Sequence, residues 1–248
     1  MFKRPVVIVI CLLLSVTSAQ AEEHATGIEN VLVFGASGRI GQHIVDEALL
    51  RGYTVTGVSR SADRLADYAD RINIETGDIL DRARTAELIA AHDAVIVSVG
   101  GPPQSQVPEE YIAALAAESL IEVLEGFGAD GPRMIFVGNL FTLIYEDGQT
   151  PLELGRVDDT HRNYAMFYGH QIALDRFRDS ANVNWTVASP PNGLRLEGRT
   201  GEVQWGGDEL LRDADGVPLQ ISPEDYAFAI FEELEAGNYV RQRFNVGR

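Results

Sequence analysis

VLVFGASGRIG, residues 31–41, decides the fold of this 248-residue chain. Its first four residues are all apolar, as in a strand buried on both faces of a parallel sheet. A glycine-rich turn follows at once, and apolar residues then recur at helical spacing until Arg51-Gly52 supplies a stop. A strand, a glycine-rich turn and a helix in this order are typical of a nucleotide-binding α/β fold.

The turn carries three glycines at a spacing of three residues. The first permits the tight turn out of the strand, the second lets backbone N–H groups approach a pyrophosphate, and the third lets helix and strand pack closely. The N-terminus of the helix adds the positive end of its dipole. A purely structural turn would hardly require all three glycines, so the motif predicts a dinucleotide site. We expect the cofactor to contact Gly35, Ser37, Gly38, Arg39, Ile40 and Gly41.

Strand and helix patterns alternate along the rest of the chain. Strands are predicted at residues 54–58, 72–75, 94–98, 134–137, 185–188 and 243–246, and helices at 62–68, 83–90, 109–127, 164–180 and 223–235. Residues 198–211 predict an irregular hairpin. The prediction is an α/β protein, a Rossmann-like doubly wound parallel sheet with a small C-terminal substrate-cleft extension whose residues 192–215 roof the cleft. Without repeats or linkers, residues 29–248 read as one NAD(P)-binding domain.

The ends of the next strands suggest further cofactor contacts. A basic residue after the second strand accommodates the 2′-phosphate of NADP, whereas an acidic residue binds the ribose of NAD. Arg60 stands there, 19 residues after Gly41, with Arg39 as a second guanidinium. NADP is therefore predicted, with NAD as the alternative if Arg60 is only a solvated loop charge. The ends of the third and fourth strands add Gly77, Asp78, Val99, Gly100 and Gly101, each of which a plain turn would also explain.

The first residues predict a secretory signal. Lys3 and Arg4 precede a short apolar run at residues 6–16, which leads to the small-residue site Ala19-Gln20-Ala21. We expect cleavage after Ala21, so that residues 1–21 are the signal peptide, 22–28 a linker, and the mature protein is periplasmic or secreted. An uncleaved anchor is the alternative, although the apolar run is only about half the roughly 20 residues that cross a bilayer.

Charge limits the partners. The chain carries 20 basic and 37 acidic residues, a net charge of −17, which makes nucleic acid and anionic membranes poor partners. We therefore expect a small-molecule substrate and, after signal cleavage, no contact with a membrane. The sequence leaves the oligomeric state open.

Asp158, Asp159 and His161 fit a solvated acidic loop better than a metal site, so no metal is expected.

Three segments carry a resemblance to a known family. GASGRIG at 35–41, NVNWTVASPP at 182–191 and RTGEVQWGGDELLRDADG at 199–216 resemble the NADH-flavin reductase family. That family belongs to the atypical short-chain dehydrogenase/reductases, beside NmrA-like proteins and flavin reductases of the biliverdin reductase B type. The resemblance covers nearly all of residues 29–248. It implies NAD(P) at the glycine loop, with a flavin as a possible substrate.

Lysine usage restricts the chemistry. Most short-chain dehydrogenases use a Tyr-x-x-x-Lys pair for proton transfer, but Lys3 is the only lysine in the sequence. Tyr168 and His170, on the corresponding helix, are the candidate catalytic residues, with Tyr164 as an alternative tyrosine; packing within the helix is the competing interpretation.

The cofactor itself performs hydride transfer, so reduction of a flavin, quinone or similar conjugated acceptor does not require a protein acid. The sequence thus favours an NAD(P)H-dependent oxidoreductase. A non-catalytic NAD(P)-binding sensor or partner-binding protein of the NmrA-like kind, and a nucleotide-sugar epimerase or dehydratase, are the alternatives.

Overall fold

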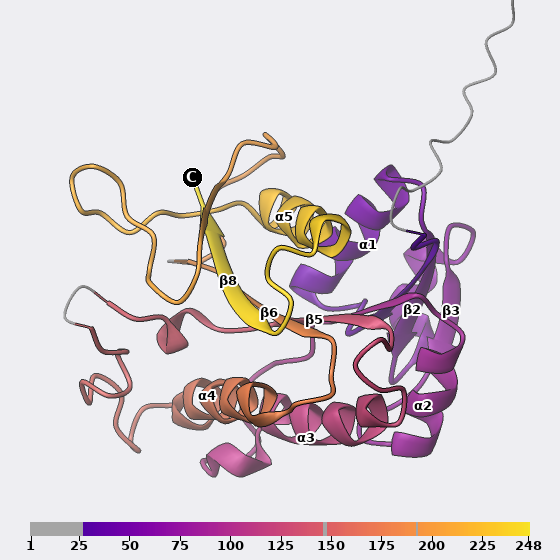
Figure 1. Cartoon of the computed structure of the whole chain (residues 1–248), viewed down its shortest axis with the longest axis horizontal. Coiled ribbons are helices and arrows are strands. Elements are labelled where there is room, and N and C mark those ends of the chain that lie inside the picture. The colour runs from indigo at the N-terminus through magenta and orange to yellow at the C-terminus, as the bar shows by residue number, and fades with distance from the viewer. Residues whose placement is uncertain (1–26, 146–147, 192) are drawn as a thin grey trace, which may run out of the picture.

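The computed structural model describes residues 27–145, 148–191 and 193–248 (Figure 1). The predicted signal peptide and most of the predicted linker lie outside these residues. Within them, the strands form one eight-stranded sheet in the order β3-β2-β1-β4-β5-β6-β8-β7. All neighbours pair in parallel except β7 and β8, which are antiparallel. The strands are β1 (Asn30–Phe34), β2 (Thr54–Ser59), β3 (Asn73–Thr76), β4 (Ala94–Val97), β5 (Arg133–Val137), β6 (Trp185–Ser189), β7 (Gln204–Gly206) and β8 (Gln242–Gly247).

Helices cover both faces of the sheet, which confirms the predicted doubly wound α/β architecture (Figure 1). One face carries α1 (Arg39–Leu50) and α5 (Pro223–Ala236), and the other carries α2 (Arg82–Ala90), α3 (Ile112–Glu125) and α4 (Tyr164–Asp179). Strand β1 supplies both cores, because alternate side chains of a strand point to opposite faces. Val31 and Val33 pack in the core with α1 and α5, whereas Leu32 and Phe34 pack in the core with α2, α3 and α4.

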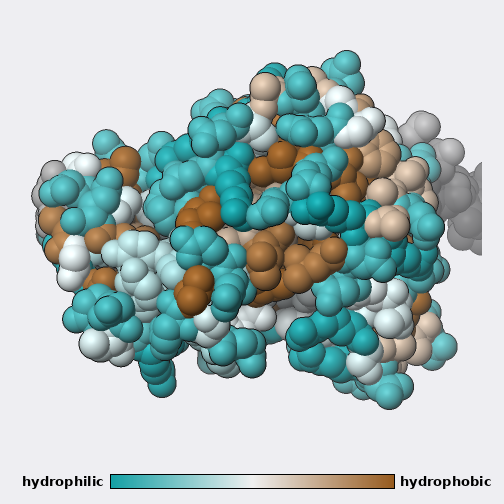
Figure 2. Space-filling view, turned by 90° about the horizontal axis from the view of Figure 1, so that it is seen from below, coloured by the Kyte–Doolittle hydropathy of each residue, from teal (hydrophilic) through white to brown (hydrophobic). Residues whose placement is uncertain are grey.

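The face that carries α2, α3 and α4 is seen from below in Figure 2. Hydrophilic residues surround this face, and apolar residues gather in a hollow near its middle. None of the helices in the described ranges is both long and apolar enough to span a bilayer.

Two predicted helices differ from the observed ones. Residues 62–68 form a 3₁₀ helix, η1 (Ala62–Tyr68). The predicted helix 109–127 is divided into a short 3₁₀ turn, η2 (Pro108–Glu110), and α3. Tyr111 separates them, because its backbone is extended, with φ −71° and ψ 140°. This break turns the tyrosine side chain toward the cleft described below.

The predicted hairpin at residues 198–211 is wrong. β7 pairs with β8 near the C-terminus, so its partner is distant in the sequence. The short antiparallel contact in this part of the chain joins Arg212 and Pro218 instead. A third 3₁₀ turn, η3 (Leu140–Thr142), follows β5. Ile144 just after it forms a bridge with Glu209 of the segment between β6 and α5, which is called the tail below.

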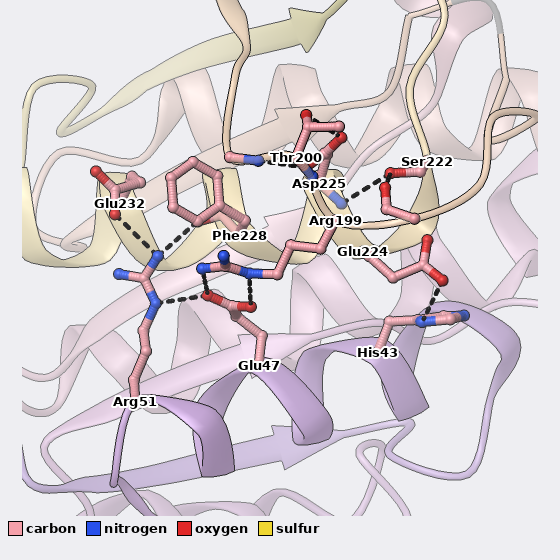
Figure 3. Close-up of polar contacts among 12 residues, drawn as sticks. His43, Glu47, Arg51, Arg199, Thr200, Ser222, Glu224, Asp225, Phe228 and Glu232 are labelled. Carbon is pink, nitrogen blue, oxygen red and sulfur yellow. Dashed lines mark hydrogen bonds and ion pairs between the residues drawn. The ribbon is translucent and has the colours of Figure 1, made fainter.

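Part of the tail is bound to α1 and α5 by buried charges (Figure 3). Glu47 on α1 is only 4% exposed. Its carboxylate accepts hydrogen bonds from Arg51 Nε at 2.8 Å and from Arg199 Nε and Nη2 at 2.7 and 2.9 Å. Arg51 also pairs with Glu232 on α5 at 2.8 Å. A buried carboxylate is retained only when its charge is paired in this way.

A second buried carboxylate, Asp225 in the first turn of α5, binds the same part of the tail (Figure 3). It accepts hydrogen bonds from Thr200 N at 2.7 Å, Thr200 Oγ1 at 2.9 Å and Gly201 N at 2.9 Å. These bonds lower the pKa of Asp225, although its burial acts in the opposite direction. Helix α1, which begins at the glycine loop, is thereby fixed to α5 and to the tail.

Candidate dinucleotide site

The glycine loop leaves no space for side chains at its first and third glycines. Gly35 has φ +76°, and a Cβ there would lie 2.3 Å from the carbonyl oxygen of Ser98. A Cβ on Gly41 would lie 2.0 Å from the carbonyl oxygen of Gly35. Both distances are far inside van der Waals contact, so the turn out of β1 and the seating of α1 on that turn require glycine.

Gly38 occupies the N-cap position of α1. Its N–H donates to the carbonyl of Gly35 at 2.9 Å, and no side chain caps the helix. The first N–H groups of a helix have no intrahelical acceptors, so an uncapped N-terminus is suited to bind an anion. Arg39 and Ile40 begin the helix; the Arg39 side chain is exposed, whereas that of Ile40 packs against the core. Ile40 can therefore contact a phosphate only through its backbone. Arg39 can do so through its backbone or its guanidinium.

A cleft of about 390 Å³ opens in front of this loop, at the carboxyl ends of β1, β2, β3 and β4. Most of the predicted cofactor residues line it: Gly35, Ser37, Gly38, Arg60, Gly77, Asp78, Val99, Gly100 and Gly101. Arg39, Ile40 and Gly41 are not among its lining residues and form the start of α1 beside it. The cleft therefore brings together four loops that are separated in the sequence.

The end of the cleft beside β2 is basic. Arg60 and Arg64 both line it, and neither forms an ion pair with any carboxylate of the described ranges. Ser37 and Ser59 lie close by, with their hydroxyl oxygens 3.3 Å apart. Sequence reasoning missed Arg64, which stands in the first turn of η1 directly after the loop that carries Arg60. The Asp78 carboxylate accepts the N–H of Leu80 at 3.0 Å, so it stabilises its own turn as well as facing the cleft.

Tyr168 and His170, the predicted catalytic residues, do not line this cleft. His170 is 8% exposed, and its ring centroid lies 5.6 Å from that of Tyr111 and 6.4 Å from that of Phe136. Burial lowers the pKa of His170 to about 4, so the ring is neutral at pH 7. Its Nδ1 has no hydrogen-bond partner among the described residues. These surroundings favour the packing interpretation.

Tyr168 lines a different cavity, of about 440 Å³, between α4, β8 and the segment that follows β5. Its hydroxyl donates to the carbonyl of Leu152 at 3.3 Å, and its ring lies 4.5 Å from that of Tyr164. The polar side of this cavity includes Arg178 and Arg243, both paired with Asp208. The structure thus separates Tyr168 and His170 from each other and from the glycine loop.

The predicted tail residues are also absent from the cleft: none of residues 193–215 is among those that line it. The expectation that residues 192–215 roof the cleft is not met within the described ranges, because the hydrogen bonds of Asp225 and Glu47 hold residues 199–201 against α1 and α5. Residue 192 itself lies outside the described residues. In the described ranges, no group of three or more His, Cys, Asp or Glu residues is arranged to hold a metal ion.

A parallel sheet of this order, with a glycine loop after β1 and an uncapped helix N-terminus at the loop, defines a dinucleotide-binding α/β protein. Comparison with known families agrees. The chain belongs to the NAD(P)H-binding family, whose model matches residues 35–236. The family match supports a nicotinamide cofactor as the ligand of this chain. The close backbone contacts at Gly35 and Gly41 are those that the glycine motif predicts for a tight turn and a closely packed helix.

Similar proteins cover nearly the whole chain. The uncharacterized protein YwnB of Bacillus subtilis is 30% identical over 216 residues, which are 86% of this chain and 96% of YwnB. A solved structure from Streptococcus pneumoniae, named "putative NADH-flavin reductase", has a TM-score of 0.75 and 25% identity and covers 89% of this chain and 99% of its own. A Burkholderia pseudomallei structure, named "putative exported protein", has a TM-score of 0.74 and 28% identity, with coverages of 89% and 100%.

Proposed function

We propose that this protein is an NADPH-dependent oxidoreductase that passes hydride to a flavin, a quinone or a similar conjugated acceptor. The observation that carries the proposal is the pair of arginines at the β2 end of the cleft, Arg60 and Arg64. In a chain of net charge −17, two guanidiniums without a carboxylate partner in the described ranges are available to an anionic ligand. The 2′-phosphate of NADPH lies at this end of a Rossmann-type site, and arginine binds phosphate with charge-assisted hydrogen bonds.

The acceptor class follows from what the chain lacks. Lys3 is the only lysine, so no Tyr-x-x-x-Lys pair is available. His170 is buried, neutral and outside the cleft, which leaves it poorly suited to donate a proton. NADPH, when bound, supplies a hydride, and a flavin or quinone that also takes one proton from solvent is reduced by two electrons without a protein acid. The Streptococcus pneumoniae structure named for NADH-flavin reduction supports the same class.

The chain's own residues then have a positioning role. The glycine loop and the N-terminus of α1 bind the pyrophosphate, Arg60 and Arg64 bind the 2′-phosphate, and the backbone at Gly100 and Gly101 borders the nicotinamide half. Holding the reactants in contact can itself supply a large part of a rate enhancement.

Turnover should therefore survive loss of both candidate acid residues. With saturating NADPH and with FMN or a quinone as acceptor, we expect Tyr168→Phe and His170→Ala to keep kcat within about tenfold of the wild type. A positioned general acid is typically worth about 10²- to 10⁴-fold, so its loss would be plain in steady-state assays. A drop beyond about 10²-fold in either variant, with the fold intact by circular dichroism, would replace this mechanism with acid catalysis.

The missing tyrosine–lysine pair also favours a second candidate, a non-catalytic NADPH-binding sensor. The two are separated by the same assay: NADPH binding by the wild type without turnover of any flavin, quinone or bilin supports the sensor. An epimerase is less well supported, although a Bacteroides thetaiotaomicron structure named "putative epimerase" is 26% identical with a TM-score of 0.74. Such enzymes also use the Tyr-x-x-x-Lys pair, which this chain lacks.

Export is part of the proposal. The charged, apolar and Ala-x-Ala pattern of residues 1–21 supports it, as does the 28% identity to the protein named "putative exported protein". We expect the protein purified from its native source to begin at Glu22 and to fractionate outside the cytoplasm, which intact-mass spectrometry of each fraction would measure. Cytosolic protein that still begins at Met1 would contradict export.

A further inference from the structure

Tyr111 closes the loop that follows β4. This loop leaves the sheet at Ser98 and returns at the start of α3, and several of its residues line the cleft. The Tyr111 side chain is 5% exposed, lines the cleft, and donates its hydroxyl proton to the carbonyl of Gly101 at 3.1 Å. Burial raises the pKa of Tyr111, so the hydroxyl keeps its proton at neutral pH and remains a donor.

The Gly101 backbone depends on this hydrogen bond to keep its conformation. Its φ of +142° lies in the region that residues with side chains rarely adopt, and a glycine is free to leave it. Most of residues 100–110 are exposed, and hydrogen bonds within the loop, such as the one from Val107 N to Ser105 Oγ at 3.0 Å, join residues close together in the sequence. The Tyr111 bond instead joins the two ends of the loop across ten residues.

Helix α4 is shaped to support Tyr111 from behind. Gly169 lies inside this helix, and a Cβ there would lie 2.7 Å from the Cβ of Tyr111 and 2.9 Å from its Cδ1. Glycine in a helix interior is less stable than alanine, so the close packing of the tyrosine has to offset that loss of stability. The neutral ring of His170 lies beside the same tyrosine, 5.6 Å between centroids and tilted by 52°.

Strand order decides which half of the cofactor meets this loop. β2 and β3, which lead to Arg60 and Gly77, lie on one side of β1, and β4, which leads to Gly101, lies on the other. A dinucleotide crosses the sheet at such a point, with its pyrophosphate on the glycine loop. Arg60 and Arg64 therefore face the adenosine half, and the Gly101 backbone faces the nicotinamide half.

We propose that Tyr111 is a positioning residue for the nicotinamide half of the cofactor: its hydroxyl fixes the Gly101 backbone against the bound dinucleotide, and Gly169 and His170 hold the tyrosine in place. This inference rests on the proposed NADPH site. It gives the conspicuous Gly169-His170 pair of α4 a role in support of binding rather than in proton transfer.

The test compares a whole cofactor with its adenosine half. Calorimetry on the full chain would measure the Kd of NADPH and of adenosine 2′,5′-bisphosphate for the wild type and for Tyr111→Phe. We expect the variant to weaken NADPH binding about fivefold, the typical effect of one lost hydrogen bond, and to leave adenosine 2′,5′-bisphosphate binding within twofold. The matched control is Tyr68→Phe. Tyr68 does not line the cleft, and its hydroxyl donates a similar hydrogen bond, of 3.3 Å, to the Gln42 carbonyl, which the substitution removes. It should change neither Kd.

Equal weakening of both ligands by Tyr111→Phe, or no change in either, overturns the positioning role while the proposed function stands. Failure of the wild type to bind either ligand overturns the proposed function and this inference with it. A thermal unfolding temperature of Tyr111→Phe close to that of the wild type, together with selective loss of NADPH affinity, supports the inference.

Discussion

Gly38→Asp is expected to abolish NADPH binding, with a loss of affinity above about 100-fold, while the protein remains folded. The substitution puts a carboxylate at the N-cap of α1, where the backbone has to approach the pyrophosphate. Aspartate is a preferred N-cap residue and would satisfy the same N–H groups that a phosphate would bind. Its Cβ would lie 3.1 Å from the carbonyl of Gly35, a contact that a small shift of the loop can relieve. In the variant, the N–H groups at the start of α1 should therefore bind the new carboxylate instead of the pyrophosphate.

The matched control is Gly207→Asp, which adds the same charge at an exposed glycine whose Cβ would meet nothing within 4 Å. Thermal unfolding without ligand should be unchanged in the control, and unchanged or slightly raised in Gly38→Asp. Titration of NADPH, followed by calorimetry, should show wild-type affinity for the control. If Gly38→Asp binds NADPH within tenfold of the wild type, the pyrophosphate is not at the N-terminus of α1.

Local sequence patterns were sufficient for the seven parallel strands and for most of the cleft. The run Val31 to Phe34 is apolar without alternation, and both of its faces are indeed buried under helices. The glycine spacing predicted a tight turn and a helix packed closely on it, both without room for side chains. In the structure, a Cβ on Gly35 would lie 2.3 Å from the Ser98 carbonyl oxygen, and a Cβ on Gly41 would lie 2.0 Å from the Gly35 carbonyl oxygen. Such features depend on residues close together in the sequence.

Features that depend on distant residues could not be predicted in this way. β7 finds its partner in β8, and the tail is held by the buried carboxylates Glu47 and Asp225, none of which a hairpin pattern reveals. Tyr111 stands in an apparently continuous helical pattern, and only its extended backbone brings its hydroxyl to Gly101. The motif around His170 suggested proton transfer, but its depth in the core and its neutral state follow from packing against Tyr111 and Phe136.

Arg60→Asp is expected to weaken NADPH binding by about 30-fold or more and NADH binding by less than threefold. The change replaces a charge-assisted contact with repulsion at the 2′-phosphate, a loss on the order of 2 kcal/mol. NADH has no phosphate at this position, so it loses only a weak long-range attraction. Arg64→Asp should act in the same direction, because Arg64 lines the same end of the cleft. The selectivity for NADPH over NADH should fall in both variants, and further when the two are combined.

The control for net charge is Arg162→Asp, an exposed arginine outside the cleft. It changes the total charge by the same amount, so it reports the effect of the overall field on an anionic ligand, which should be small at physiological ionic strength. Calorimetric titration of NADPH and NADH on each variant at two salt concentrations separates the two effects, because a contact at the phosphate persists at high salt better than long-range attraction does. Equal losses for NADPH and NADH in Arg60→Asp and Arg64→Asp would mean that these arginines do not read the 2′-phosphate, and the cofactor preference would then revert to NAD.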